Sequence, residues 1–246
     1  MSVGLERTVG ILDLFTSDVP EWSVSDASRA LDLPKSTVWE SLQAMTEVGL
    51  LRRVGRGKYR LGWRSFQLGL RARMTSEISV PAWETMRNLV EAHHETTHLA
   101  SRYRDQVVYL EKIAPPGGVR GSVARVGERL PAHCTAAGKV LLAYLSSSEI
   151  AALYPDESFP GLTAYSITRR TTLVAELARV REHGHALDVE ESALGMCSVA
   201  APITNSHGDT AWALSMSFAA HHPRPRRERY AQAVMDAATR LCSVAE

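Results

Sequence analysis

The chain has 246 residues, of which 45% are hydrophobic and 22% are charged, and its formal net charge is +1. This length suits one large or two modest domains, and the hydrophobic fraction excludes a disordered chain and allows a sizeable core. The near-neutral total charge by itself indicates no class of partner.

The first predicted element is an amphipathic helix in "MSVGLERTVGILDLF", with Leu5, Val9, Leu12 and Phe15 on one face. It lacks the basic segment and unbroken apolar core of a signal peptide. No apolar run approaches the roughly 18 residues of a membrane span. The three cysteines have no CxxC spacing, which favours unpaired thiols in a reducing compartment. These features predict a cytoplasmic protein with no membrane partner.

Two further helices follow. Ser23, with Asp26 three residues later, predicts the start of a short helix that runs through Ala30. Pro34 suits the first turn of the next helix, which begins the stretch "LPKSTVWESLQAMTEVGLL". At about 100° per residue, one face of that helix is apolar and the opposite face is polar. The apolar residues are Val38, Leu42 and Met45, and the polar residues are Ser36, Glu40, Gln43 and Glu47. The apolar face is therefore expected in a core and the polar face against a partner.

A basic hairpin comes next, with strands predicted at 50–54 and 58–61 around the turn "GRG". Residues 49–73 contain eight Arg or Lys and no Asp or Glu. Such a stripe is typical of a phosphate-binding surface, although a solvated cationic loop has the same composition. Three helices and a basic hairpin form the pattern of a winged helix-turn-helix, whose third helix enters the major groove. The candidate DNA-binding residues are Lys35, Ser36, Thr37, Trp39, Glu40, Gln43, Arg52, Arg53, Arg56, Lys58 and Arg60.

The segment "HETTH" (94–98) matches the H-E-x-x-H signature of zinc proteases, which requires both histidines on one face of a helix. The β-branched Thr96 and Thr97, and the alternation that follows them, predict instead that His98 begins a strand. No third metal ligand follows at a recognisable spacing. We therefore expect no metal, no cofactor and no catalytic residue, with His93 and His94 on the surface.

The remainder predicts a mixed domain with an antiparallel central sheet and helices on its faces, so the fold class is α+β. Strands are predicted at 97–103, 106–113, 122–126, 186–190, 197–203 and 211–218, and helices at 80–92, 135–145, 149–153, 173–183 and 226–241.

The start of the helix at "TAAGK" is a candidate carboxylate site near Ala137 and Gly138, because a helix N-terminus has free N–H groups and a favourable dipole. Tight helix–sheet packing explains the same small residues equally well. Arg125 is a candidate cation for this site, and His133 is a candidate for pH tuning.

Three blocks, "LPKSTVWESLQAMTEVGLLRR…GKYRLG", "LPAHCTAAGKVLLA" and "HALDVEESALGMCSVAAPI", resemble the isocitrate-lyase-regulator (IclR) family of bacterial transcription factors in order and spacing. The resemblance spans about residues 5–241. It implies a winged helix-turn-helix domain (1–62), a linker helix (63–78) and an effector-binding domain similar to GAF domains (79–246). It also implies a regulator, in the first instance a repressor, that binds double-stranded operator DNA. The implied assembly is a homodimer or a dimer of dimers, and the implied effector is a small organic acid or aromatic compound.

The resemblance also assigns effector contacts, residue by residue, to Asp188, Met196, Ser198, Ser215 and Ser217. The two serines at 215 and 217 share one face of a predicted strand. The sequence departs from the family pattern at Ser198, where cysteine is usual, so a thiol-dependent role does not carry over.

The third helix departs from the pattern as well, since Trp39 and Glu40 replace a usual His or Tyr and a usual Arg. Glu40 would repel phosphate but can accept a hydrogen bond from cytosine N4. Trp39 either packs on the flank or contacts DNA. Two alternatives to a regulator remain. One is a sensor or scaffold whose helix-turn-helix binds protein; the other is a hydrolase, against which no motif such as G-x-S-x-G is present.

Overall fold

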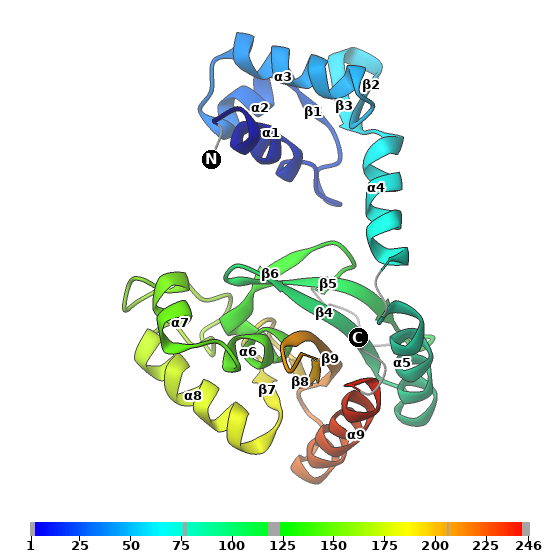
Figure 1. Cartoon of the computed structure of the whole chain (residues 1–246), viewed down its shortest axis with the longest axis vertical. Helices are drawn as coiled ribbons and strands as arrows, with labels where there is room; N and C mark the ends of the chain where they lie inside the picture. The colour runs from blue at the N-terminus through cyan, green and yellow to red at the C-terminus, as the bar shows by residue number, and fades with distance from the viewer. Residues whose placement is uncertain (1–2, 76–77, 118–123, 206, 243–246) are drawn as a thin grey trace. The chain divides into compact units, whose positions relative to one another are not determined.

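The computed structural model describes residues 3–75, 78–117, 124–205 and 207–242. The chain divides into two compact units, Met1–Ser76 and Glu77–Glu246 (Figure 1). Each unit has its own hydrophobic core, and the linker helix assigned from the resemblance falls in the first.

The first unit is a winged helix-turn-helix, as predicted. Its elements are α1 (Val3–Asp13), β1 (Trp22–Ser23), α2 (Val24–Leu31), α3 (Lys35–Glu47), β2 (Leu51–Val54), a 3₁₀ turn (Gly55–Gly57), β3 (Lys58–Leu61) and α4 (Trp63–Met74). The strands form an antiparallel sheet in the order β1-β3-β2, and β1 is an addition that the sequence did not indicate. Ser23 caps α2 by accepting a hydrogen bond from the backbone N–H of Asp26, which confirms the predicted start of that helix.

The core of this unit confirms the predicted apolar face of α3. Val38, Leu42 and Met45 are buried, together with Ile11. The predicted first helix is present as α1. Leu12 and Phe15 pack against this core beside the buried Ile11, whereas Leu5 and Val9 are exposed. Helix α1 contacts both α2 and α3.

Helix α4 is fixed to the wing at its first turn. The Gly62 N–H donates to the Leu50 carbonyl at 2.7 Å, and the Ser65 hydroxyl donates to the same carbonyl at 2.8 Å. A Cβ atom at Gly62 would lie 2.2 Å from the Gly49 carbonyl oxygen, so only glycine permits this approach. The start of α4 therefore keeps a fixed orientation to the wing.

The second unit is built on a six-stranded antiparallel sheet in the order β6-β5-β4-β9-β8-β7, which confirms the predicted α+β class. Its helices are α5 (Ser79–His93), α6 (Ala136–Ala143), α7 (Ser147–Leu153), α8 (Arg170–His183) and α9 (Arg224–Cys242). Its strands are β4 (Thr96–Tyr103), β5 (Gln106–Ile113), β6 (Arg129–Pro131), β7 (Ala186–Val189), β8 (Met196–Thr204) and β9 (Thr210–Ala219).

The strand predicted at 122–126 was wrong. Residues 122 and 123 lie outside the described residues, and Ala124 to Val126 form no strand. The chain turns at Arg125, whose carbonyl accepts the Glu128 N–H, and Gly127 has a φ of +82°. The edge strand begins only after this turn, as β6.

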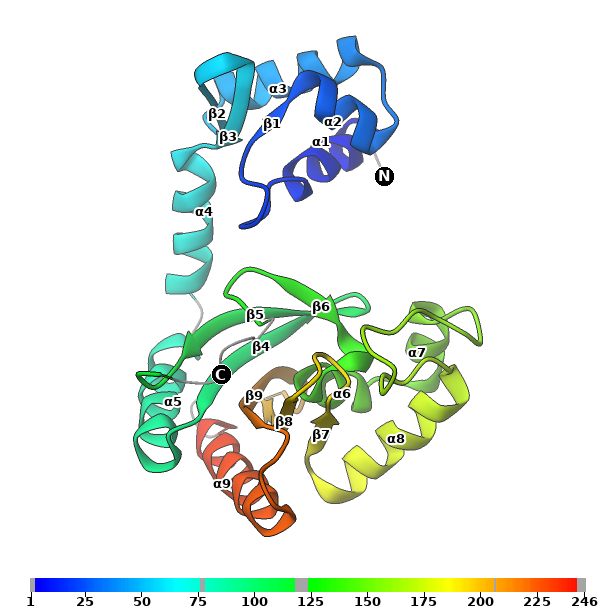
Figure 2. The ribbon, with the colours of Figure 1, turned by 180° about the vertical axis from the view of Figure 1, so that it is seen from behind.

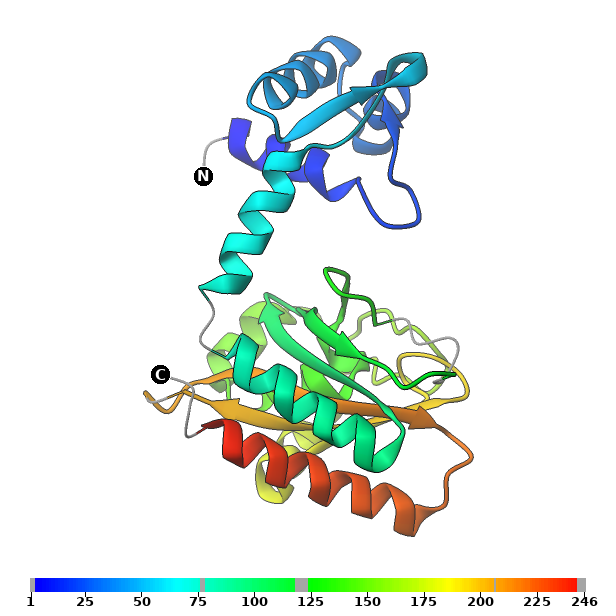
Figure 3. The ribbon, with the colours of Figure 1, turned by 90° about the vertical axis from the view of Figure 1, so that its right-hand side faces the viewer.

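Helices cover both faces of the sheet. On one face, α5 and α9 pack side by side against β4, β8 and β9, as Figure 3 shows. On the other face lie α6 and α8, with α7 beside them (Figure 2). Side chains alternate between the two layers: Leu99 and Leu214 belong to the first core, and Ala100 and Ala213 to the second.

The "HETTH" segment confirms the prediction of a strand. Helix α5 ends at His93, and His94 takes a left-handed conformation with φ of 56°. Strand β4 starts at Thr96, so His98 is a buried strand residue and the two histidines do not share a helix face. His94 is exposed, and His93 is half-buried, with its ring centroid 5.5 Å from that of Tyr230. In the described part of the chain, no group of three or more His, Cys, Asp or Glu is arranged to hold a metal.

Candidate functional site

The polar face of α3 is open in the first unit. Lys35, Ser36, Trp39 and Glu40 are exposed, and Thr37 and Gln43 are half-buried. Trp39 retains 50% of its accessible surface, so packing on the helix flank leaves half of the indole for a partner. The first turn of α3 contains no acidic residue, so its dipole and Lys35 both favour an anion there.

The wing divides its basic residues into two groups. Arg52, Arg53 and Arg56 are exposed, and Arg56 forms the turn with φ of 63°. Arg60 and Lys58 instead form ion pairs with Glu21, with N–O distances of 2.9 and 3.5 Å. The sequence pattern gave no sign of this role of Glu21, because it depends on the pairing of β1 with β3.

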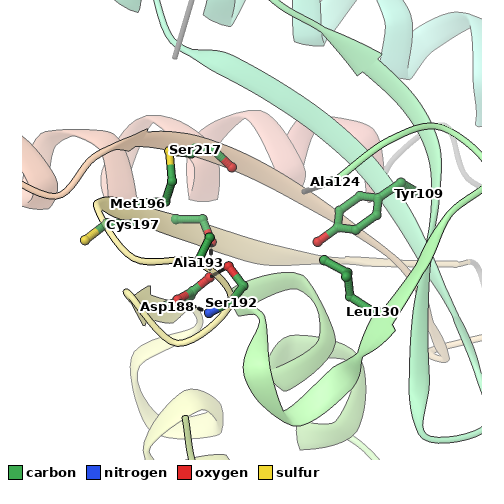
Figure 4. Close-up of a pocket in the computed structure, with 10 residues that line it drawn as sticks. Tyr109, Ala124, Leu130, Asp188, Ser192, Ala193, Met196, Cys197 and Ser217 are labelled. Atoms are coloured by element: carbon green, nitrogen blue, oxygen red, sulfur yellow. Dashed lines mark hydrogen bonds between the residues drawn. The ribbon is translucent and has the colours of Figure 1, made fainter. Parts of the chain in front are cut away.

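A pocket lies on the α6 face of the sheet in the second unit (Figure 4). Its lining residues are Tyr109, Ala124, Leu130, Asp188, Ser192, Ala193, Met196, Cys197, Ser198 and Ser217. Four of the nine predicted effector contacts are therefore brought together: Asp188, Met196, Ser198 and Ser217.

Asp188 is the most constrained of these residues. Its Oδ1 accepts the backbone N–H groups of Glu191 (2.7 Å) and Ser192 (3.3 Å). Its Oδ2 accepts the hydroxyls of Ser192 (2.6 Å) and Ser198 (3.3 Å). Burial raises the pKa of Asp188, while these hydrogen bonds and the positive charge of Lys139 oppose that rise. The carboxylate is held as an acceptor at one end of the pocket.

Tyr109 forms the opposite wall and was not among the predicted site residues. Its hydroxyl is directed across the pocket toward Asp188 and Ser192 (Figure 4). Burial, with the charge of Asp188, raises the pKa of Tyr109, so the phenol stays protonated. One sequence pattern could have identified Tyr109. Residues alternate between the two faces of β5, so Tyr109 faces the same core as Val107.

The other five predicted effector contacts do not line this pocket. Ser215 is buried on β9, two residues from Ser217, where it pairs with His98. Arg125 lies in the turn before β6. The His133 Nε2 atom lies 3.1 Å from the Pro160 carbonyl oxygen, and its ring packs on Phe159 and Tyr154. Burial lowers the pKa of His133.

Ala137 and Gly138 have a packing role, the alternative left open above. Both are buried, and the Gly138 N–H already donates to the Thr135 hydroxyl at 2.9 Å. A Cβ atom at Gly138 would lie 2.2 Å from the Ala132 carbonyl oxygen. Glycine at this position is therefore required by the approach of α6 to the turn that precedes it.

A buried ion pair, also absent from the predicted site, supports the loop that carries Ser192. The Lys139 side chain is 1% exposed, and its Nζ donates to Glu191 at 2.7 Å and to Glu176 at 3.4 Å. Burial raises the pKa of Glu191, and Lys139 counteracts that rise. The pair ties α6 to the loop after β7.

Comparison with known proteins agrees with this architecture. Residues 73–243 match the family description "Bacterial transcriptional regulator IclR C-terminal", and residues 4–55 match "IclR helix-turn-helix domain". The chain is similar to the HTH-type transcriptional regulator XynR of Escherichia coli (strain K12), with 35% identity over 87% of this chain and 84% of the relative. It is 33% identical to the HTH-type transcriptional regulator KdgR of the same organism, over 88% of this chain and 78% of the relative.

Among solved structures, an IclR homolog complexed with 4-hydroxybenzoate from Microbacterium hydrocarbonoxydans is similar in fold, with a TM-score of 0.81, 27% identity and coverage of 98% of both chains. Among the helices that the structure describes, none is long and apolar enough to cross a membrane. The family matches extend over both compact units, and the relatives over most of this chain. The chain belongs to the IclR family of bacterial transcriptional regulators.

Proposed function

We propose that this regulator acts in the cytoplasm as a repressor, binding operator DNA through α3 and the wing and responding to a small organic acid. In this proposal it has no enzymatic activity, and the pocket serves recognition only. The observation that carries the proposal is that Arg52, Arg53 and Arg56 of the wing are all exposed, on the same unit as the open polar face of α3. Exposed arginines neutralise phosphates without regard to sequence, and α3 then reads base edges.

On α3, Lys35, Ser36 and Thr37 lie at the end that points toward phosphates and bases in this class of domain. Glu40 and Gln43 lie one and two turns further along. A carboxylate accepts from cytosine N4 and an amide pairs with adenine, so these two side chains are the proposed base readers. Trp39 supplies an apolar contact through its exposed half.

The lining of the pocket suits a small organic effector. It combines apolar walls with hydroxyls and one carboxylate, the mixture that is typical of small-molecule sites. The homolog with 4-hydroxybenzoate supports an organic acid as the class of ligand.

A homodimer is proposed through α4. Trp63, Phe66, Leu70 and Met74 follow one stripe of this helix and are 74, 62, 39 and 76% exposed. In the described residues of α4 none is buried within the chain. A repeating apolar stripe of this kind is covered in proteins by a second helix, and a second copy supplies one. Pairs of dimers are compatible with the same stripe.

Regulation then follows from a shift between two arrangements of paired DNA-binding units. Because α4 is fixed to the wing at Gly62, a change in how two copies of α4 pack would move the wings apart or together. A coupling free energy of about 1–3 kcal/mol corresponds to a 5–150-fold change in operator affinity.

The test is fluorescence anisotropy of the purified chain on labelled DNA from upstream of its own gene, over a series of salt concentrations. We expect saturable binding that is at least ~10³-fold tighter than binding to a scrambled duplex of the same length. Equal, weak binding to both duplexes would refute operator recognition and favour a scaffold role, for which the acidic Glu40 and Glu47 on α3 are the supporting observation.

A further inference from the structure

We propose that a second pocket of the C-terminal unit, separate from the effector pocket, binds a small primary amine in its ammonium form. Residues of α6, of α8 and of the loops before α8 and after β7 line this pocket. The lining of the amine pocket and the lining of the effector pocket have no residue in common. The site therefore adds a ligand class that the operator and effector assignments do not include.

Charged side chains meet in this pocket where α8 packs against α6 (Figure 2). Lys139 comes from α6, Glu176 and Arg179 come from α8, and Glu191 comes from the loop after β7. The cavity beside them has a volume of about 270 Å³. A single water molecule needs only about 10–15 Å³ of such space. The pocket therefore has room for a small organic molecule.

Glu191 has a buried acceptor that lacks a partner. The residue is 8% exposed, and its Oε1 accepts a hydrogen bond from Lys139 Nζ at 2.7 Å. Its Oε2 is buried and has no hydrogen-bond partner among the described residues. Buried polar atoms are paired in the great majority of cases, and an unpaired one is destabilising. An unpaired carboxylate oxygen on a residue that lines a cavity indicates that its donor arrives from outside the chain.

The charges around this cavity favour a cation as the ligand. The carboxylates of Glu176 and Glu191 share one buried cation, Lys139, at 3.4 and 2.7 Å. Arg179 is the other cation of the lining, but it lies 3.7 Å from Glu176 and its side chain is 74% exposed, so solvent screens its charge. The buried part of the site therefore carries one negative charge in excess.

The fitting cation is organic and has N–H donors. In the part of the chain that the structure describes, no group of three or more His, Cys, Asp or Glu is arranged to hold a metal ion. A primary ammonium group has three donors, enough for Glu191 Oε2 and for Glu176 at once, whereas a quaternary ammonium group has none. Ile167 and the ring of Tyr165, which is 62% exposed, add apolar surface for the carbon chain of the amine.

Isothermal titration calorimetry of the full chain tests the site with three amines: butylamine, 1,4-diaminobutane and ethanolamine. Their matched alcohols are butan-1-ol, 1,4-butanediol and ethylene glycol. We expect at least one amine to bind, with its alcohol at least tenfold weaker. Tetramethylammonium, which is charged but has no N–H donor, should also bind at least tenfold more weakly than that amine.

Four variants separate charge recognition from packing. Glu176→Gln and Glu191→Gln keep the side-chain size and each remove one negative charge, so each should weaken the amine at least tenfold. Arg179→Gln removes a competing positive charge from the lining and should bind the amine more tightly than the wild type. Glu182→Gln, at an exposed position of α8 outside the lining, is the matched control and should bind as the wild type does.

Weaker binding by the two glutamate variants together with tighter binding by Arg179→Gln would support the site, because a packing defect does not change affinity in opposite directions. If Glu191→Gln fails to fold, Glu176→Gln and Arg179→Gln decide the result. Wild-type affinity in the glutamate variants, equal affinity for amine and alcohol, or no binding of any of the three amines would overturn the inference. None of these measurements involves operator DNA, so their outcome is independent of the proposed function.

Discussion

The Ser198 hydroxyl donates to the Asp188 carboxylate at 3.3 Å across the β7–β8 pair, and this bond joins two residues that line the same pocket. The pairing register brings them together, and the loop after β7 adds three more donors to the same carboxylate. Asp188 is therefore an organising acceptor, and its substitution should affect the pocket more than the fold.

We predict that Asp188→Asn weakens effector binding at least tenfold and leaves operator affinity unchanged. The asparagine side chain has an NH₂ group in place of one carboxylate oxygen. The donors that bonded to that oxygen then lack an acceptor. Isothermal titration calorimetry with a carboxylate that binds the wild type measures the effector affinity. Fluorescence anisotropy with labelled operator DNA measures the operator affinity. Asp156→Asn, at an exposed position, is the matched control, and equal effector affinity in both variants would contradict the role of Asp188.

The free energy of unfolding should fall in mild acid because of His98. Its folded pKa of about 3 lies below the ordinary 6.5, so below pH 6.5 the unfolded chain takes up a proton that the folded chain does not. The contribution of His98 to the free energy of unfolding therefore falls progressively as pH drops from 6.5 toward 3. This contribution decreases by about 2 kcal/mol between pH 7.5 and 5.0. Burial raises the pKa of Asp188 and Glu191, which act in the opposite direction.

Urea unfolding at pH 7.5 and 5.0 checks this. The carboxylates contribute equally to the wild type and to His98→Asn, so they cancel when the changes in unfolding free energy of the two proteins are subtracted. The wild type should lose about 2 kcal/mol more than His98→Asn on acidification. His207→Asn, at an exposed position, should behave as wild type. The same pH dependence in His98→Asn as in the wild type would refute the assignment.

Gly138→Ala should destabilise the second unit by about 2 kcal/mol or more, because the new Cβ atom collides with the Ala132 carbonyl oxygen. Gly69→Ala is the matched control, since Gly69 is also helical, in α4, and a Cβ atom added there would meet no other atom within 4 Å. That change should stabilise its unit by about 0.5–1 kcal/mol. The midpoints of urea unfolding distinguish the two variants. If Gly138→Ala leaves the free energy of unfolding unchanged, α6 can shift to accommodate the added methyl group.

Lys139→Met should cost about 3–5 kcal/mol, because it leaves the buried Glu191 carboxylate without its closest cation. The double variant Lys139→Met with Glu191→Met removes both charges and should recover most of the loss. Chemical denaturation of the two variants measures this coupling. If the double variant is as unstable as the single one, packing of the lysine stem rather than charge explains the loss.

Arg56→Gly should reduce the salt dependence of DNA binding by about one unit of slope, for one lost phosphate contact. Glycine suits the left-handed backbone at this position, so the change removes charge without strain. Arg60→Ala should reduce the slope less, because Arg60 is already paired with Glu21. Anisotropy over a salt series compares the two variants. Equal slopes for Arg56→Gly and wild type would exclude the turn from the DNA contact.

The sequence was sufficient for features that repeat locally. The spacing of Val38, Leu42 and Met45 located α3 and its buried face, and alternation placed His98 in a strand rather than on a helix. The antiparallel sheet followed from the order of the elements. The edge strand was misplaced because the turn around Gly127 depends on hydrogen bonds to β5. Local sequence propensity cannot predict hydrogen bonds between separate segments.

The pocket was only partly predictable for the same reason. Asp188, Met196, Ser198 and Ser217 came from a family resemblance, whereas Tyr109 enters the site through strand order. Lys139 and Glu191 are 52 residues apart in sequence, and no periodic pattern indicates that they meet. Glu21 likewise neutralises part of the wing only because β1 pairs with β3. Contacts between distant segments set these features.

Nuclease footprinting of the wild-type chain on the DNA upstream of its own gene tests the central claim most directly. A dimer that reads DNA through α3 predicts two protected half-sites whose centres are separated by about one helical turn or a multiple of it. Protection should disappear in the Arg52→Ala, Arg53→Ala, Arg56→Gly triple variant at a concentration that saturates the wild type. Uniform protection along the fragment, or none, would contradict the assignment of α3 and the wing as an operator-reading surface.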